Sequence, residues 1–156
     1  AIIKALHSTL NTGTLVGYPL VNLEIKLLSA QYNELEASDV AYQMAASMAV
    51  KEALEKGRPT LLEPLMKVQV SVPEENTGDV IGDLSNRRGR ILNMEPRPGG
   101  WQAINAEMPL ATMFGYSTHL RSKTQGRGSF TMEFDRYDQM PANVEKDVLQ
   151  KLTGLY

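Results

Sequence analysis

The feature that most restricts the fold is a regular switch between strand and helix periodicity that begins after residue 60. Up to Pro73, apolar residues alternate with polar ones, as in a strand with one buried face: Met66, Val68, Val70 and Val72. The stretch EENTGDVIGDLSNRRG follows with helical spacing, with acids at its start, arginines in its last turn and Gly89 as its stop. These two patterns predict a strand and then a helix.

The residues that follow predict a hairpin, a helix and a strand. RILNMEP and WQAINAEMP flank the turn RPGG, and LATMFGYS has the spacing of a short helix. SFTMEFDRY alternates again, with Phe130, Met132 and Phe134 facing in. This order of elements specifies a ferredoxin-like βαββαβ sandwich, with both helices on one face of an antiparallel sheet. We therefore predict an α+β domain at 61–140 and a C-terminal helix and tail at 141–156.

The first 60 residues predict a smaller unit of helix, strand and helix. The first ten residues have helical spacing, but no capping side chain precedes Ala1. This fits both a chain that begins inside a larger protein and an ordinary frayed terminus. LVNLEIKLLS predicts a strand with one buried face, and Ser38 caps the helix that follows. The methionines of that helix, Met44 and Met48, are expected to pack on the strand. Pro59 marks the end of the unit.

Composition excludes several kinds of chemistry. The 156 residues include no cysteine, which rules out disulfides, thiolate metal sites and a thiol nucleophile. No apolar run approaches the length of a membrane span, about 20 residues, and the N-terminal stretch is too short and polar for a secretory signal. We expect a soluble, cytoplasmic chain without membrane contact. With 16 Lys and Arg against 18 Asp and Glu, any contact with a polyanion must come from local clusters.

The usual catalytic and metal-binding patterns are missing from the sequence. RSKTQGRGSF (121–130) holds three cations and two glycines, but it lacks both phosphate-loop spacings and precedes a strand instead of a helix. His7 and His119 lie in separate elements without a partner at ligand spacing. No GxSxG motif marks a nucleophile, and VPEENTG is acidic where an acyl phosphatase needs an anion-binding loop. We expect no catalytic residue, metal or cofactor in this chain.

Basic residues form two local clusters in the second half of the chain. One cluster surrounds the end of the predicted first helix of 61–140, and the other precedes the last strand: Arg87, Arg88, Arg90 and Arg97, then Arg121, Lys123 and Arg127. They fit either a solvated surface with cations favoured by helix dipoles, or a contact with an RNA backbone. Base stacking is disfavoured because the outward residues of the first strand are Lys67, Gln69 and Ser71.

Several long stretches of this sequence resemble one protein family. LLEPLMKVQVSVPEENTGDVIGDLSNRRGRI and MFGYSTHLRSKTQGRGSFTMEF are similar to the last domain of bacterial elongation factor G, across most of residues 61–138. GYPLVNLEIKL and ASDVAYQMAASMAVKEALEKGRPTLLEP resemble the second part of the preceding domain, which is of the ribosomal-protein S5 domain 2-like type. The resemblance implies a fragment, with part of domain IV at 1–60 and domain V at 61–140.

The resemblance also implies a role for the parent protein and a set of contact residues. The parent would be a GTPase that promotes ribosomal translocation of tRNA and mRNA, with GTP and Mg²⁺ bound by a domain that precedes Ala1. Domain IV would reach tRNA and mRNA at the decoding centre through a tip loop, Gln31, Tyr32, Asn33 and Glu34. Domain V would rest near rRNA and the stalk-base protein, with rRNA contacts on one side of the domain from Arg87, Arg88, Arg90, Arg121, Lys123 and Arg127. We expect a monomer.

One departure from the family lies in the tip loop, where the family commonly has a histidine and this chain has Asn33. Because an amide cannot carry a proton as imidazolium can, we expect this loop to position its target by hydrogen bonds. Two other functions stay open from the sequence, a stand-alone ferredoxin-like ligand-binding module and a small acyl-phosphatase-like enzyme. Within the family, the sequence does not separate translocation from ribosome recycling by a specialised paralogue.

Overall fold

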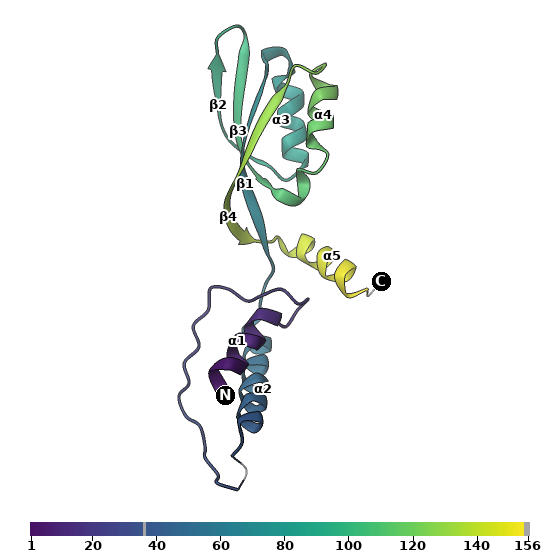
Figure 1. Cartoon of the computed structure of the whole chain (residues 1–156). Helices are drawn as coiled ribbons and strands as arrows, with labels where there is room; N and C mark the ends of the chain where they lie inside the picture. The colour runs from purple at the N-terminus through teal and green to yellow at the C-terminus, as the bar shows by residue number, and fades with distance from the viewer. Residues whose placement is uncertain (36, 155–156) are drawn as a thin grey trace. The chain divides into compact units, whose positions relative to one another are not determined.

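The computed structural model describes residues 1–35 and 37–154, and the chain divides into two compact units (Figure 1). One unit is Leu61–Met140. The other is Ala1–Thr60 together with the residues from Pro141 onward. In the part of the chain that the structure describes, we find no helix with the length and apolar character needed to cross a membrane.

The second unit has the βαββαβ order that the sequence predicts. Its elements are β1 (Leu62–Pro73), α3 (Thr77–Asn86), β2 (Arg90–Arg97), β3 (Trp101–Pro109), α4 (Tyr116–Lys123) and β4 (Ser129–Gln139). The four strands form an antiparallel sheet in the order β2-β3-β1-β4. Both helices cover the same face of this sheet (Figure 1). The ferredoxin-like α+β prediction is confirmed.

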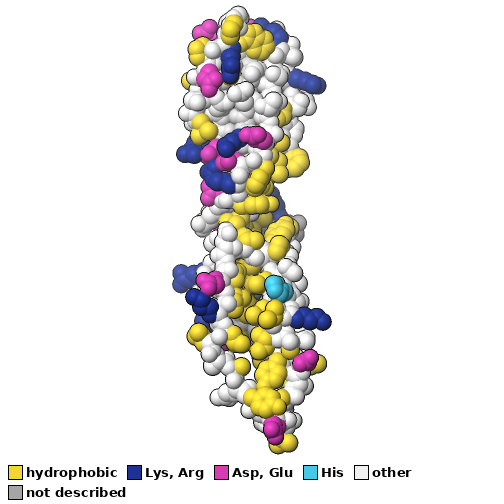
Figure 2. Space-filling model, turned by 60° about the vertical axis from the view of Figure 1, so that its left-hand side comes forward, with side chains coloured by type: hydrophobic (Ala, Val, Ile, Leu, Met, Phe, Trp, Pro, Cys, Tyr) yellow, Lys and Arg dark blue, Asp and Glu magenta, His cyan; other side chains and the backbone are white. Residues whose placement is uncertain are grey.

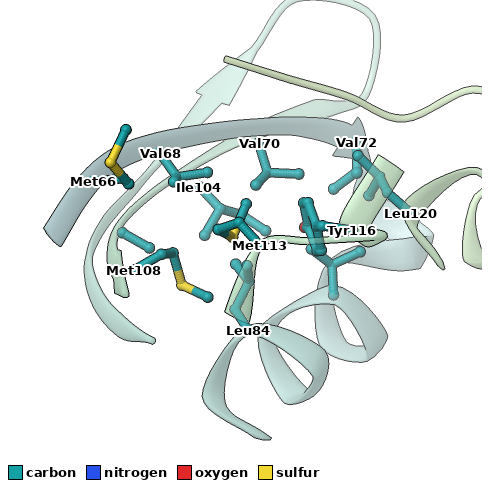
Figure 3. Packing of buried hydrophobic residues seen from close by; sticks show 12 residues of the cluster. Met66, Val68, Val70, Val72, Leu84, Ile104, Met108, Met113, Tyr116 and Leu120 are labelled. Atoms are coloured by element: carbon teal, nitrogen blue, oxygen red, sulfur yellow. The ribbon is translucent and has the colours of Figure 1, made fainter. Parts of the chain in front are cut away.

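The core of the second unit lies between the sheet and its two helices (Figure 3). Side chains from every layer meet there with less than 2% of their surface exposed, among them Val70, Val72, Leu84, Ile104, Met108 and Tyr116. Phe130 of β4 packs edge-on against the Tyr116 ring, with centroids 5.0 Å apart. Met132 and Phe134 share this face of the sheet but are 40% and 54% exposed, because β4 is an edge strand that the helices do not cover along its whole length.

The helix predicted at LATMFGYS begins later than expected. Residues 110–112 form a short 3-10 turn, η2 (Leu110–Thr112), and α4 starts only at Tyr116. Gly115 precedes α4 with a φ of 74°, a left-handed conformation that separates the turn from the helix. Arg121 and Lys123 therefore lie in the last turn of α4 and not in a loop.

The end of α3 also differs from the prediction. The helix ends at Asn86, so the arginines follow it instead of occupying its last turn. The Arg88 N–H donates to the Ser85 carbonyl at 3.0 Å and the Gly89 N–H to the Leu84 carbonyl at 2.8 Å, which is the pattern of a Schellman motif. Arg88 occupies the left-handed position with a φ of 64°, where glycine is usual.

The first unit contains α1 (Ile2–Thr12) and α2 (Asp39–Gly57), and α5 (Ala142–Thr153) belongs to it as well. Thr9 of α1 is buried, and its hydroxyl donates to the Ser47 hydroxyl of α2 at 3.2 Å. The predicted cap is confirmed, because the Ser38 hydroxyl accepts from the Ala41 N–H at 3.1 Å.

The strand predicted at LVNLEIKLLS is not formed. Apart from a bend at Asn22, where φ is 59°, the segment is extended, but it pairs with no other strand. The side chains of Val21, Leu23, Ile25 and Leu27 are 39% to 63% exposed. A strand needs a neighbour for its backbone hydrogen bonds, and the described residues of 1–60 contain no second strand. The expected packing of α2 methionines on the strand is also wrong, since Met44 and Met48 are 61% and 68% exposed. Figure 2 shows hydrophobic side chains on the surface of this unit.

Candidate functional site

Two of the cations singled out in the sequence, Arg88 and Arg127, lie at opposite ends of β1. Arg88 pairs with Glu63 at the start of β1, whereas Arg127 pairs with Glu75, just beyond its end. β1 has 12 residues, and a strand rises about 3.3 Å per residue, so roughly 35 Å separates the two groups. Arg88 and Arg127 therefore lie far apart along the domain, and the expectation that the six candidate cations share one side of it stays a prediction.

Arg87 and Arg88 use their guanidinium groups inside the domain. Arg87 donates to Asp83 at 3.1 Å and to the Thr112 carbonyl at 2.6 Å, and it lies 5.2 Å from the Tyr116 ring centroid. Arg88 donates two hydrogen bonds to Glu63, both 2.8 Å long, and the Glu63 side chain is only 7% exposed. The hydrogen bond to Glu63 raises the pKa of Arg88. Neither arginine is a free cation in this structure.

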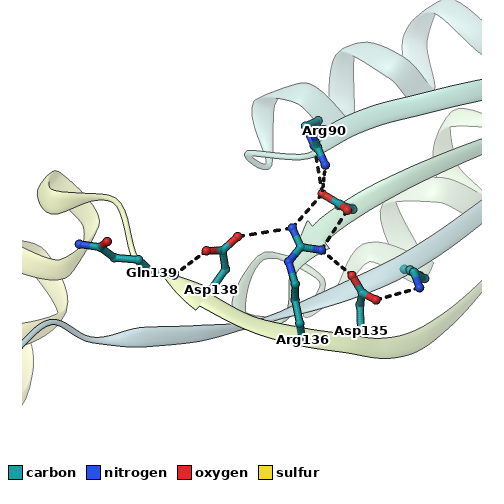
Figure 4. Close-up of polar contacts among 7 residues, drawn as sticks. Arg90, Asp135, Arg136, Asp138 and Gln139 are labelled. Atoms are coloured by element: carbon teal, nitrogen blue, oxygen red, sulfur yellow. Dashed lines mark hydrogen bonds and ion pairs between the residues drawn. The ribbon is translucent and has the colours of Figure 1, made fainter. Parts of the chain in front are cut away.

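Arg90 belongs to a network of ion pairs among the strands (Figure 4). Glu107 of β3 accepts from Arg90 of β2 at 2.7 Å and from Arg136 of β4 at 3.0 Å. The hydrogen bond from Arg136, followed by that from Arg90, lowers the pKa of the Glu107 carboxyl. A cation between these strands is therefore balanced by a nearly buried carboxylate, and the Arg90 charge is not available in full to a partner.

A β-bulge extends the same network. The pairing of β4 with β1 skips from Phe134 to Arg136, which leaves Asp135 without a partner on β1. Asp135 accepts from Lys67 at 2.8 Å and from the adjacent Arg136. The hydrogen bond from Lys67 lowers the pKa of Asp135 and raises that of Lys67. The bulge brings two neighbouring residues of β4 into one set of ion pairs.

The helix end in RSKTQGRGSF presents the free cations. Arg121 and Lys123 are exposed in the last turn of α4, where the helix dipole favours positive charge. Their side chains have no ion pair or hydrogen bond with any residue that the structure describes. Arg127 is 44% exposed but pairs with Glu75. Of the six candidates, Arg121 and Lys123 are thus the two that can contact an anion without giving up an internal partner.

The residues that follow α4 form a turn that is fixed by buried hydrogen bonds and close packing. Thr124 is fully buried, its hydroxyl donates to the Leu120 carbonyl at 2.7 Å, and it accepts from the Gly128 N–H at 2.8 Å. A β-carbon on Gly128 would lie 2.8 Å from the Thr124 hydroxyl, so this position has no room for a side chain. Asn76 donates to the Lys123 carbonyl at 3.1 Å and ties the turn to the start of α3. These hydrogen bonds hold in place the backbone next to Arg121 and Lys123.

The predicted tip residues form an exposed turn between the extended segment and α2. The Asn33 side-chain carbonyl accepts from the Leu35 N–H at 3.1 Å, and its main-chain carbonyl accepts from the Ala37 N–H at 2.8 Å. The Tyr42 hydroxyl of α2 donates to the Gln31 carbonyl at 3.3 Å. Tyr32 is 73% exposed. Asn33 therefore shapes the turn by an Asx-type bond and leaves the other side chains free to contact a partner.

Two hollows of the second unit were not among the sequence-based predictions. A hollow of about 540 Å³ lies over the strands, and amides bridge it, with Gln69 donating to Asn105 at 2.9 Å and Asn105 to Asn93 at 2.6 Å. A second hollow of about 670 Å³ includes Trp101 and Arg127. The lone tryptophan beside the RPGG turn is the signal that could have pointed to the second hollow. No group of three or more metal-ligating side chains occurs among residues 1–35 and 37–154.

Comparisons with known proteins cover both units. The family model described as "Elongation factor G, domain IV" matches residues 1–58, and that described as "Elongation factor G C-terminus" matches residues 60–148. A crystal structure of a protein from Thermus thermophilus matches 99% of this chain with 35% sequence identity and a TM-score of 0.83. The chain spans only 23% of that longer protein.

Proposed function

Because the chain belongs to the elongation factor G family, we propose that it is the ribosome-contacting C-terminal part of a factor that promotes GTP-dependent translocation of tRNA and mRNA. Matches to two consecutive domains of the family support this proposal. The observation that carries it is the pair Arg121 and Lys123 in the last turn of α4, whose side chains have no partner among the residues that the structure describes. The parent would act as a monomer in the cytoplasm.

GTP chemistry belongs to another part of the parent in this proposal. The sequence of this chain contains neither the GxxxxGK[ST] phosphate loop nor a related Gly-rich spacing before a helix. GTP and Mg²⁺ would be held by a separate domain, which makes the parent a GTPase. The role left to this chain is to bind the ribosome in the orientation that translocation needs.

The cations of the C-terminal domain would contact rRNA phosphates. A phosphate contact gains affinity by releasing counterions, and it costs least where the cation has no internal partner to lose. This criterion favours Arg121 and Lys123, and it makes Arg90 and Arg127 secondary because each must share its charge with a glutamate. The stalk-base protein would lie beside the same domain.

We expect the double variant Arg121→Gln/Lys123→Gln of the full-length parent to bind ribosomes more weakly than the wild type. Loss of two phosphate contacts should also reduce the slope of log affinity against log salt by about 1.5. Ribosome co-sedimentation over a salt series measures both quantities. The double variant Lys146→Gln/Lys151→Gln, which removes the same charge from two exposed positions of α5, is the control. Unchanged affinity of the first variant at low salt would contradict the contact.

The tip loop, 31–34, would reach tRNA and mRNA at the decoding centre. Its exposed position between the extended segment and a capped helix supports this, as does the match of residues 1–58 to domain IV. Asn33 would act by holding the turn and offering its amide group. Gln31 is a suitable neighbour for comparison, because its side chain has no hydrogen bond within the described part of the molecule.

Replacing Asn33 by alanine should slow single-round translocation by the parent about twofold to tenfold, the range expected for one lost hydrogen bond. Gln31→Ala should have a smaller effect, since it leaves the Asx-type bond in place. Ribosomal subunit splitting is measured in parallel, because a recycling paralogue would lose that activity instead. If deletion of 31–34 changes neither rate, the loop is only a connection between elements.

A further inference from the structure

We propose that the hollow beside the turn between β2 and β3 binds a guanidinium or ammonium side chain presented by a partner protein. The hollow is lined by η1 (Glu74–Asn76), by the turn and by the stretch that precedes β4: Pro73, Glu74, Glu75, Gly99, Gly100, Trp101 and Arg127. The turn between β2 and β3 lies at one end of the domain (Figure 1), and its Gly99 and Gly100 line the hollow. The inference rests on the proposed function only in placing this domain within a larger assembly.

The hollow is held open by its backbone. Gly99 and Gly100 have φ angles of 80° and 74°, so the turn is built from two residues without side chains in a left-handed conformation. A β-carbon on Gly99 would lie 3.8 Å from the Trp101 ring, whereas one on Gly100 would meet nothing within 4 Å. The Glu74 N–H donates to the Gly100 carbonyl at 2.9 Å. This bond fixes the acidic turn against the half-buried indole.

The charge of the hollow favours a cationic ligand. Glu75 is paired with Arg127, and Arg97, which faces Trp101 from β2, is paired with Glu95. The Glu74 carboxylate is exposed and bonds to none of the residues described here, so one negative charge is left uncompensated. An aromatic ring attracts a cation over its face, and an adjacent carboxylate adds a charge-assisted hydrogen bond.

The same charge disfavours RNA in this hollow. An unpaired base could stack on Trp101, but its phosphates would approach Glu74, and like charges repel. The free cations at Arg121 and Lys123 are separate from the residues that line the hollow. The domain would thus carry two distinct contacts, a cationic one for RNA and an acidic, aromatic one for a protein.

Trp101 is the single tryptophan of the chain, so its fluorescence reports on the hollow directly. The 156-residue chain is titrated with a glycine–arginine repeat peptide, a glycine–glutamine repeat peptide and a single-stranded RNA oligonucleotide. We expect the arginine peptide to change the emission and to bind several-fold more tightly than the glutamine peptide. Glu74→Gln should weaken this binding by about threefold to fivefold, as expected for one exposed charge beside an aromatic ring.

Glu133→Gln is the matched control, because it removes an exposed carboxylate from β4 that does not line this hollow. It should leave the binding of the arginine peptide unchanged. The proposal fails if RNA quenches Trp101 and Glu74→Gln tightens RNA binding, since the hollow would then be a base-stacking site. It also fails if no probe changes the emission. Ribosome binding through Arg121 and Lys123 is measured separately, so either failure leaves the proposed function to its own test.

Discussion

Replacing Arg88 by alanine should lower the free energy of unfolding by about 3 kcal/mol, since it leaves the Glu63 carboxylate buried without a partner. The two groups are joined by two hydrogen bonds of 2.8 Å, and the Glu63 side chain is 7% exposed. Arg88 itself is 30% exposed, which places the expected loss near the lower end of the range for buried ion pairs. Denaturant unfolding of the 156-residue chain measures the loss.

Two further variants separate the contribution of the Glu63 ion pair to stability from that of the backbone conformation at Arg88. Arg88→Gly suits the left-handed φ of 64°, so it should lose about 1 kcal/mol less than Arg88→Ala while still leaving Glu63 unpaired. Arg90→Ala breaks an exposed pair and leaves Glu107 bound to Arg136, so we expect a loss below about 1 kcal/mol. Equal losses for Arg88→Ala and Arg90→Ala would show that burial of Glu63 does not set the strength of its ion pair.

A double-mutant cycle tests the pair itself. In the Glu63→Gln background the carboxylate is absent, so Arg88→Ala should cost much less than it does in the wild type. This result bears on function, because Arg88 is one of the candidate rRNA contacts. A defect of Arg88 variants in ribosome binding would then follow from partial unfolding, whereas a defect at Arg121 and Lys123 would not.

The element order of the second unit could be predicted because its periodicity is local. Each strand alternates along its own residues, and Pro73 and the RPGG turn end two of the strands. The segment 20–29 alternates just as clearly but forms no strand, since pairing depends on a second strand that the described residues of the first unit do not supply. An alternating sequence pattern predicts a tendency to form a strand, but the strand forms only where a second strand pairs with it.

The candidate site was only partly predictable for a similar reason. The residue types that bind phosphate are visible in the sequence, but whether a cation is free depends on acids far along the chain. Arg88 is separated by 25 residues from Glu63, and Arg127 by 52 residues from Glu75. No local pattern reveals such pairs. The structure therefore reduces six candidate cations to two whose side chains have no partner among residues 1–35 and 37–154.

The second large effect is expected for Gly89→Ala, which should lower the free energy of unfolding by about 2 kcal/mol through overpacking. A β-carbon at Gly89 would lie 2.2 Å from the Met108 sulfur and 2.6 Å from the Leu84 carbonyl oxygen. The methionine side chain can move, but the carbonyl belongs to α3 and already accepts the Gly89 N–H at 2.8 Å. The added carbon must therefore displace the end of the helix from the sheet.

Gly82→Ala provides a control of opposite sign within the same helix. Gly82 is exposed inside α3, and a β-carbon there would meet nothing within 4 Å. Alanine at that position should raise the free energy of unfolding by up to about 1 kcal/mol, because it is the better helix former. Both variants are compared with the wild type by denaturant unfolding. If Gly89→Ala is as stable as the wild type, the end of α3 can shift without cost, and the sequence needs glycine there for some reason other than this close approach.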